Sequence, residues 1–211
     1  MSARARDAFD RLLQRLAGSE PDHRPESLRF GATLLQPGDA RLVRLIPPVS
    51  RPAAVLIGLQ DGDDPGILLT VRAAHLRQHA GQIAFPGGTI EADDEGPAQA
   101  ALREAAEEVG LQRHQASVVG FLPDQMVLTG FRITPVIARV ASDFVPRPDH
   151  TEVQQAFTLP LTALLDPANH HPVRRSIGGV EFDVRDLHYD MHRVWGATAG
   201  MLFALYELAR A

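Results

Sequence analysis

Three glutamates lie close together near the end of a strongly helical segment of this 211-residue chain. Glu104, Glu107 and Glu108 follow one another at steps of three and one, so they occupy neighbouring positions on the helix surface. Like charges at this spacing repel one another, and the helix dipole disfavours anions in the last turns. Stability alone does not select this arrangement, which leaves two explanations, a solvated acidic surface or a binding site.

The neighbouring residues favour a binding site. Arg103 stands four residues before Glu107 and can orient it, and the turn Phe85–Gly88 precedes the helix. Gly87 and Gly88 let the backbone of this turn approach a ligand closely. Carboxylates without histidine or cysteine neighbours suit hard cations such as Mg²⁺ or Mn²⁺, which bridge phosphate oxygens and lower the pKa of bound water. This pattern predicts metal-assisted attack of water on a phosphoanhydride.

The elements around this segment indicate how it is positioned. A helix is predicted over 97–109, with its glutamates on the side opposite an apolar face that packs on a sheet. That face is formed by Ala98, Leu102, Ala105 and Val109. Short apolar runs predict strands at 53–59, 67–71, 117–122 and 133–140. Strands before and after one central helix predict an α+β fold, an α/β/α sandwich around a mixed β-sheet.

Both ends of the chain carry further helical patterns. Apolar residues over 9–16 predict a short N-terminal helix, either docked on the main domain or used as a dimer contact. The proline-rich segment 46–52 marks a boundary, so the predicted division is an N-terminal helix and linker, 1–45, packed on a main domain, 46–211. Later segments predict a short helix at 161–165, a hairpin at 180–189 and a terminal helix at 198–209.

Composition excludes several classes of function. The net charge is −5, which disfavours a broad nucleic-acid surface. The chain has no cysteine, and all 21 of its basic residues are arginine, so thiolate zinc sites, cysteine nucleophiles and Schiff-base or P-loop lysines are excluded. Neither a signal peptide nor an uninterrupted membrane span of about 20 apolar residues is present. We therefore expect a soluble, cytoplasmic protein that contacts no membrane.

The segment from Gly88 to Leu111 resembles the box of the Nudix hydrolases. That box is a glycine, five residues, Glu, seven residues, then R-E-U-x-E-E-x-G-U, where U is a bulky aliphatic residue. Residues 103–111 read R-E-A-A-E-E-V-G-L and fit the second half. Two departures occur, since six residues separate Gly88 from Glu95, and Ala105 is smaller than the usual aliphatic.

The resemblance implies a Nudix fold and roles for the box residues. Glu104 and Glu108 would be the main ligands of Mg²⁺ or Mn²⁺. Glu107 would belong to the same metal-binding and catalytic cluster, with Arg103 positioning it. Glu95, or Asp94 if the longer loop shifts the register, would contribute to the metal site.

A narrower signature lies upstream of the box. Residues 68–88 match L-L-T-x-R-[S/A]-x3-R-x3-G-x3-F-P-G-G at every fixed position. This resembles the coenzyme A diphosphatase branch of the Nudix hydrolases. The branch implies substrate binding by Arg72, Arg77, Gly87 and Gly88, because arginine forks suit phosphates; ion pairing of either arginine with the catalytic carboxylates is the alternative.

Two other positions have competing interpretations, and a third is given no role. Glu152 matches a Glu-Val position of the branch and is either a general base or further metal ligand, or a solvated loop residue. Trp195 is interpreted as a core residue, with an adenine-stacking platform as the alternative. His170 is assigned to a polar loop without a role.

The predicted reaction is hydrolysis of the diphosphate of coenzyme A or an acyl-coenzyme A. Its products would be 4′-phosphopantetheine, acylated if the substrate was, and adenosine 3′,5′-bisphosphate. The alternatives are a Nudix diphosphatase for ADP-ribose, dinucleotides or nucleoside triphosphates and, more distantly, a non-catalytic Nudix ligand sensor. A homodimer is compatible with the fold, although no residue requires it.

Overall fold

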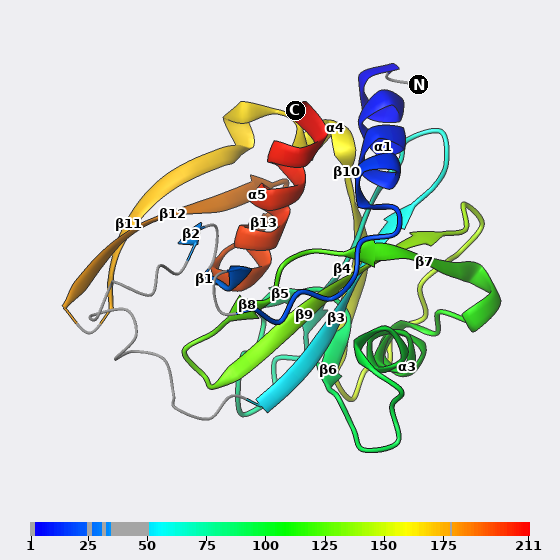
Figure 1. Ribbon diagram of the computed structural model, residues 1–211, viewed down its shortest axis with the longest axis horizontal. Coiled ribbons are helices and arrows are strands. Elements are labelled where there is room, and N and C mark those ends of the chain that lie inside the picture. The colour runs from blue at the N-terminus through cyan, green and yellow to red at the C-terminus, as the bar shows by residue number, and fades with distance from the viewer. Residues whose placement is uncertain (1–2, 25–26, 31–32, 35–50, 178) are drawn as a thin grey trace.

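A mixed sheet built around one parallel pair of strands forms the centre of the protein (Figure 1). The structure is a computed structural model that describes residues 3–24, 27–30, 33–34, 51–177 and 179–211. The parallel pair is β3 (Arg51–Gln60) and β9 (Phe131–Val140), aligned over their whole length. The strand order is β10-β4-β3-β9-β8-β1-β2, and three further strands pair with β4, β3 and β9.

The remaining strands of this sheet are antiparallel to their neighbours, apart from a parallel contact between β1 and β8. They are β1 (Arg29–Phe30), β2 (Thr33–Leu34), β4 (Gly66–Arg72), β8 (Gln125–Met126) and β10 (Val153–Pro160). Three further strands form antiparallel pairs with members of this order: β5 (Ile83–Ala84) with β4, β6 (Gly87–Thr89) with β3 and β7 (Ala116–Phe121) with β9.

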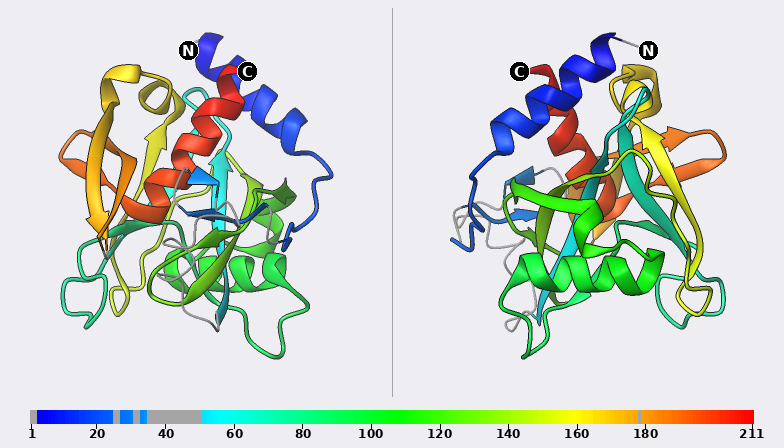
Figure 2. Two further views of the ribbon diagram at one scale, coloured as in Figure 1. Left: turned by 60° about the vertical axis from the view of Figure 1, so that its left-hand side comes forward. Right: turned by 90° about the vertical axis from the view of Figure 1, so that its right-hand side faces the viewer.

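Helices cover both faces of the sheet (Figure 2). On one face lies α3 (Pro97–Val109), which begins after Gly96 and ends at Gly110 in the left-handed conformation. On the other lie α1 (Ala3–Leu16), α4 (Leu161–Leu164) and α5 (Gly196–Arg210). Two 3₁₀ turns, Arg113–Gln115 and Pro167–Asn169, connect elements. The predicted α+β fold, an α/β/α sandwich with an N-terminal helix, is confirmed.

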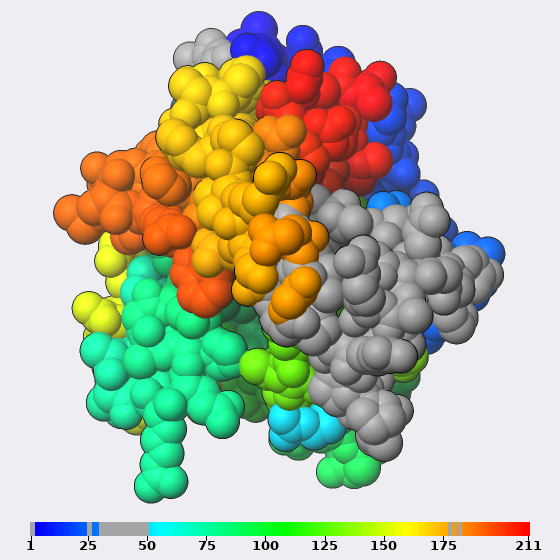
Figure 3. All heavy atoms as spheres, turned by 90° about the vertical axis from the view of Figure 1, so that its left-hand side faces the viewer, coloured from blue at the N-terminus to red at the C-terminus, as the bar shows by residue number. Residues whose placement is uncertain are grey.

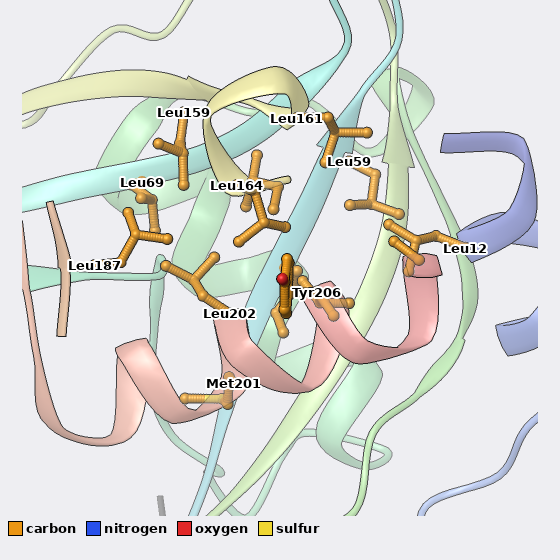
Figure 4. Packing of buried hydrophobic residues seen from close by; sticks show 14 of the residues in the cluster. Leu12, Leu59, Leu69, Leu159, Leu161, Leu164, Leu187, Met201, Leu202 and Tyr206 are labelled. Atoms are coloured by element: carbon orange, nitrogen blue, oxygen red, sulfur yellow. The ribbon is translucent and has the colours of Figure 1, made fainter. Parts of the chain in front are cut away.

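The alternation of side chains along β3 divides the core into two clusters. Leu56 packs with α3, and Ile57 packs on the opposite face, as the period of two in a strand requires. Figure 4 shows part of this second cluster, where Leu12 of α1 and Leu202 and Tyr206 of α5 approach the sheet. Arg11 of α1 also donates to the carbonyl of Ala209, 2.5 Å away. The two ends of the chain are therefore packed together.

A second, three-stranded antiparallel sheet lies beside α5. Its strands are β11 (His170–Ile177), β12 (Val180–Tyr189) and β13 (His192–Val194). Phe157 of β10 stacks on His192 of β13 at 4.2 Å between ring centroids, which fixes this sheet against the edge of the large one.

Two sequence predictions about this part of the chain are wrong. His170 does not lie in a polar loop, because it begins β11, is buried, and places its Nε2 2.7 Å from the carbonyl oxygen of Leu164. Its ring also packs against Tyr206. The second error concerns Trp195, described with the cavity below.

The predicted boundary near residue 46 lies outside the described residues, so the division into 1–45 and 46–211 stays a prediction. Among the described helices, none has the length and apolar character needed to cross a membrane.

Candidate active site

Glu108 is a buried carboxylate at the end of α3. Its residue is 4% exposed, and its Oε2 accepts a 3.4 Å hydrogen bond from the backbone N–H of Gly87. Arg72, the last residue of β4, places its Nη1 3.9 Å from Oε1 of Glu108. Burial raises the pKa of Glu108 to about 7, against the attraction of the Arg72 guanidinium. The protein therefore leaves this carboxylate only partly compensated.

Small residues bring α3 close enough to bury that carboxylate. Ala100, Ala101 and Ala105 are fully buried and pack with the sheet. A Cβ on Gly88 would lie 2.6 Å from Cδ of Glu104, so a larger residue there would displace the Glu104 carboxylate. The prediction that the glutamates project opposite the buried face is wrong for Glu108. The buried face of α3 is centred on Ala100, Ala101 and Ala105. The apolar pattern gave these small residues too little weight.

Gly87 provides a second close approach in the same turn. Its φ of 157° lies outside the range of ordinary side chains, and a Cβ there would lie 2.7 Å from Cα of Val55. The pairing of β6 with β3 holds this glycine in place. The turn can therefore lie between the central strand and the carboxylates of α3.

Arg103 connects the glutamates to the loop before α3. It donates to Glu104 at 2.9 Å, to Asp94 at 3.1 and 3.2 Å, and to the carbonyl of Thr89 at 3.1 Å. Its contact with Glu107 is longer, 3.5 Å. The hydrogen bonds from Arg103 to Asp94 hold the pKa of Asp94 below its ordinary value. Arg103 thus orients Glu104 more closely than the predicted Glu107.

The loop places its two candidate carboxylates differently. Asp94 accepts from Arg103, whereas Glu95 is exposed and donates its backbone N–H to the side chain of Gln99. Of these two carboxylates, Asp94 is therefore the one that the described contacts connect to the arginine. A metal-binding role for Glu95 stays a prediction.

The other carboxylates surround Glu108 at greater exposure. Burial raises the pKa of Glu104, while the side chain of Glu107 is 61% exposed. Glu152 is also exposed, but its charge contributes to the raised pKa values of Glu104 and Glu108, so it lies within electrostatic reach of both. The backbone N–H of Ala73 donates to the carbonyl of Glu152, which ties its loop to the end of β4.

These residues fit a divalent cation in type and charge. Within the described ranges, no three His, Cys, Asp or Glu side chains converge closely enough to form a complete metal cage. Mg²⁺, however, is commonly held by one or two carboxylates together with water and substrate phosphates. Glu104 and Glu108 would supply two hard oxygen ligands to such a cation, which would offset the unfavourable burial of both.

A cavity of about 510 Å³ opens beside this site. Arg72, Gly87 and Gly88 line it at the end near the glutamates. Its other walls come from β3, β5, β9, β12 and the first turns of α5. Figure 3 shows the face where the segment after β4 (turquoise) and the C-terminal sheet (yellow to orange) lie next to each other. Arg77 is exposed in that segment and is not among the described lining residues, so its substrate-binding role stays a prediction.

Sequence reasoning identified one residue of the far wall of the cavity, Trp195, only as an alternative interpretation and missed the arginines beside it. Trp195 is not a core residue, since it is 41% exposed and lines the cavity just before α5. Arg175 of β11 and Arg185 of β12 line the same region. The spacing of these residues in the sequence carries no recognisable pattern, because the packing of the second sheet brings them to the site only in the folded chain.

A helix with a buried glutamate and two more exposed ones behind a glycine turn, beside a cavity lined by arginines, fits a hydrolase of phosphoanhydrides. The Nudix domain family matches residues 49–178 of this chain. An Escherichia coli (strain K12) protein described as the uncharacterized Nudix hydrolase NudL is 41% identical over 152 residues, 72% of this chain and 79% of that protein. Its Enterobacter sp. (strain 638) counterpart is 40% identical over the same length.

Solved structures give weaker likenesses. A Nudix hydrolase from M. smegmatis, RenU, has a TM-score of 0.42 and 26% identity, covering 53% of this chain and 70% of that one. The NUDIX domain of Shewanella oneidensis NrtR, complexed with ADP ribose, has a TM-score of 0.44 and 19% identity, covering 60% and 86%. These scores support no argument about this chain. The family match and the relatives show that the chain belongs to the Nudix family. It is a Nudix hydrolase acting on phosphoanhydrides, a class that generally uses Mg²⁺ or Mn²⁺.

Proposed function

We propose that this Nudix hydrolase is a coenzyme A diphosphatase, cleaving coenzyme A or an acyl-coenzyme A to 4′-phosphopantetheine, or its acyl form, and adenosine 3′,5′-bisphosphate. One observation carries the proposal. The segment 68–88, which matches the branch signature, contains most of β4, all of β5 and the start of β6, and three of its residues both lie beside the glutamates and line the cavity: Arg72, Gly87 and Gly88. Its Arg72 faces Glu108 and also lines the cavity, a position suited to a diphosphate.

Each side chain has a role in this proposal. Glu104 and Glu108, with Glu107 beside them, would hold Mg²⁺ or Mn²⁺, and Glu95 would act at most through the loop. When bound, such an ion polarises a phosphoanhydride and activates a water molecule. Arg103 keeps the Glu104 carboxylate oriented through its 2.9 Å bond.

The residues on the cavity side of the site would bind the substrate and take a proton from the attacking water. Arg72 binds a phosphate oxygen, and the backbone at Gly87 and Gly88 leaves room for the diphosphate. Glu152 is exposed near the glutamates and can accept the proton of the attacking water at its carboxylate. A cytoplasmic location, a homodimer and the division at residue 45 remain proposals from the sequence.

The test compares substrates under identical conditions. The protein is incubated with coenzyme A, acetyl-coenzyme A, dephospho-coenzyme A or ADP-ribose, with Mg²⁺, with Mn²⁺ or with chelator, and products are identified by mass. We expect adenosine 3′,5′-bisphosphate to form fastest, and only with metal. Cleavage of ADP-ribose without cleavage of either coenzyme A substrate would overturn the proposal and leave the Nudix hydrolase assignment intact.

A further inference from the structure

A second arginine of the cavity is held by a different buried carboxylate. Arg175 of β11 donates from its Nη2 to both oxygens of Asp186, at 3.1 and 3.2 Å. Asp186 is 1% exposed and also accepts from Nε and Nη2 of Arg193, at 2.9 and 2.6 Å. One carboxylate between two guanidinium groups leaves a net positive charge and fixes the direction of both arginines.

Arg175 keeps hydrogen-bonding capacity for a ligand. Its Nε is buried and has no partner among the described residues, and its guanidinium carbon lies 5.4 Å from the centroid of the Trp195 ring. A buried donor without a partner is costly, so it is expected to be satisfied in the working state of the protein. The Nε of Arg72, at the diphosphate end, is unpartnered in the same way.

The cavity as a whole is suited to an anion with more than one charged group. Its described lining includes Arg72, Arg175 and Arg185 and no aspartate or glutamate, although the protein carries a net charge of −5. The first turn of α5 lines it too, and the side chain of its N-cap residue, Trp195, makes no capping hydrogen bond. Its free N–H groups add to the positive potential near Arg175.

We infer that Arg175, oriented by Asp186, binds a phosphomonoester of the substrate, with Trp195 offering a ring face to the attached base. If the proposed function is correct, that group is the 3′-phosphate of the adenosine moiety. Arg72 binds the diphosphate, and Arg175 then makes the protein distinguish coenzyme A from dephospho-coenzyme A. The guanidinium fork suits a phosphate dianion, and the aromatic ring suits adenine.

Arg175→Gln tests this inference, with Arg174→Gln as its matched control. Arg174 directly precedes Arg175 in β11, forms an ion pair with the exposed Asp183 and is absent from the described cavity lining. In the first variant Asp186 keeps its two bonds from Arg193, so the fold is expected to persist. Thermal unfolding checks this, and Arg175→Lys, which keeps the charge and loses the fork, provides a second variant.

Two readouts are compared. Without metal, calorimetry measures binding of adenosine 3′,5′-bisphosphate and of AMP; with metal, kcat/KM is measured for coenzyme A and dephospho-coenzyme A. Wild type and Arg174→Gln should favour each 3′-phosphorylated compound by about 10-fold or more, as expected for charge-assisted hydrogen bonds. Arg175→Gln should lose that preference and leave AMP binding unchanged, and Arg175→Lys should fall between.

The outcomes separate this inference from the proposed function. A preference for the 3′-phosphate that survives in Arg175→Gln, or its absence in the wild type, overturns the inference while coenzyme A hydrolysis still supports the function. A wild type that cleaves no coenzyme A, but binds the bisphosphate through Arg175, overturns the proposed function and supports the phosphate-binding site.

Discussion

At each end of the cavity an arginine of the lining lies against a buried carboxylate, Arg72 against Glu108 and Arg175 against Asp186, but the two pairs differ in how far the protein neutralises the carboxylate. Asp186 receives four hydrogen bonds of 2.6 to 3.2 Å from Arg175 and Arg193. Glu108 is nearly as buried, yet Arg72 stays 3.9 Å away and its one backbone hydrogen bond is 3.4 Å long. Burial of a charge without close partners is unfavourable.

The difference separates a positioning residue from a candidate ligand. Asp186 has its charge satisfied within the chain and serves to direct two arginines. The negative charge of Glu108 is not fully neutralised by neighbouring groups, and its pKa is raised for that reason. We therefore expect the removal of each carboxylate to have opposite effects on stability.

The largest expected effect is on activity at Glu108. Glu108→Gln should lower the rate of phosphoanhydride hydrolysis by about 10³-fold, since a metal ion at such a site contributes several kcal/mol. The unliganded variant should be as stable as the wild type or more so, because a buried charge is removed. Activity assays and urea unfolding in chelator measure both, with the exposed Glu207→Gln of α5 as control. Full activity would refute the role of Glu108.

The pH dependence of stability gives the next effect. Since the pKa of Glu108 is raised to about 7, the folded state keeps a proton that the unfolded state releases near pH 4.5. This contribution is fully present below pH 4.5 and is lost as pH rises through 7, by about 3 kcal/mol at most. Urea unfolding of the metal-free protein at pH 5 and pH 8 measures the loss.

The comparison with Glu108→Gln isolates that contribution. Carboxylates whose pKa is lowered, such as Asp94, change stability in the opposite direction in both proteins and cancel in the difference. An equal change with pH in the wild type and the variant would contradict the assignment.

The smallest of the three expected effects is the loss of stability when Asp186, at the far end of the cavity, is replaced. Asp186→Asn should reduce the free energy of unfolding by about 2 kcal/mol, less than a fully buried pair would lose, because Arg175 and Arg193 remain partly in water. Chemical unfolding measures it. Unchanged or increased stability would mean that the two carboxylates do not differ as described.

Sequence patterns predicted the parts of this molecule whose signals are local. The bounds 97–109 of α3 follow from a proline at its start and a glycine at its end, and both strands of the central parallel pair are apolar runs. β10 and β11 were missed because exposed polar residues such as Gln154 and Arg174 obscure their alternation. The contact of Arg103 with Glu107 was predictable from helix spacing, whereas its shorter bond to Glu104 was not predicted.

The rest of the site depends on tertiary packing. The burial of Glu108 depends on how closely three alanines let α3 approach, which no single-helix pattern measures. Trp195 and Arg175 reach the cavity only because the second sheet packs beside α5. The match to the Nudix domain family ends at residue 178, so Trp195 falls outside the residues that this match covers.

The packing of α1 against α5 also has a consequence for synthesis. The hydrogen bond from Arg11 to Ala209 joins residues 198 positions apart. A ribosome makes α1 early and α5 late, so the apolar side of α1, with Phe9 and Leu12, has no native partner on α5 while most of the chain emerges. Such non-local contacts fold slowly. This helix therefore remains a candidate for chaperone binding or aggregation until α5 leaves the ribosome.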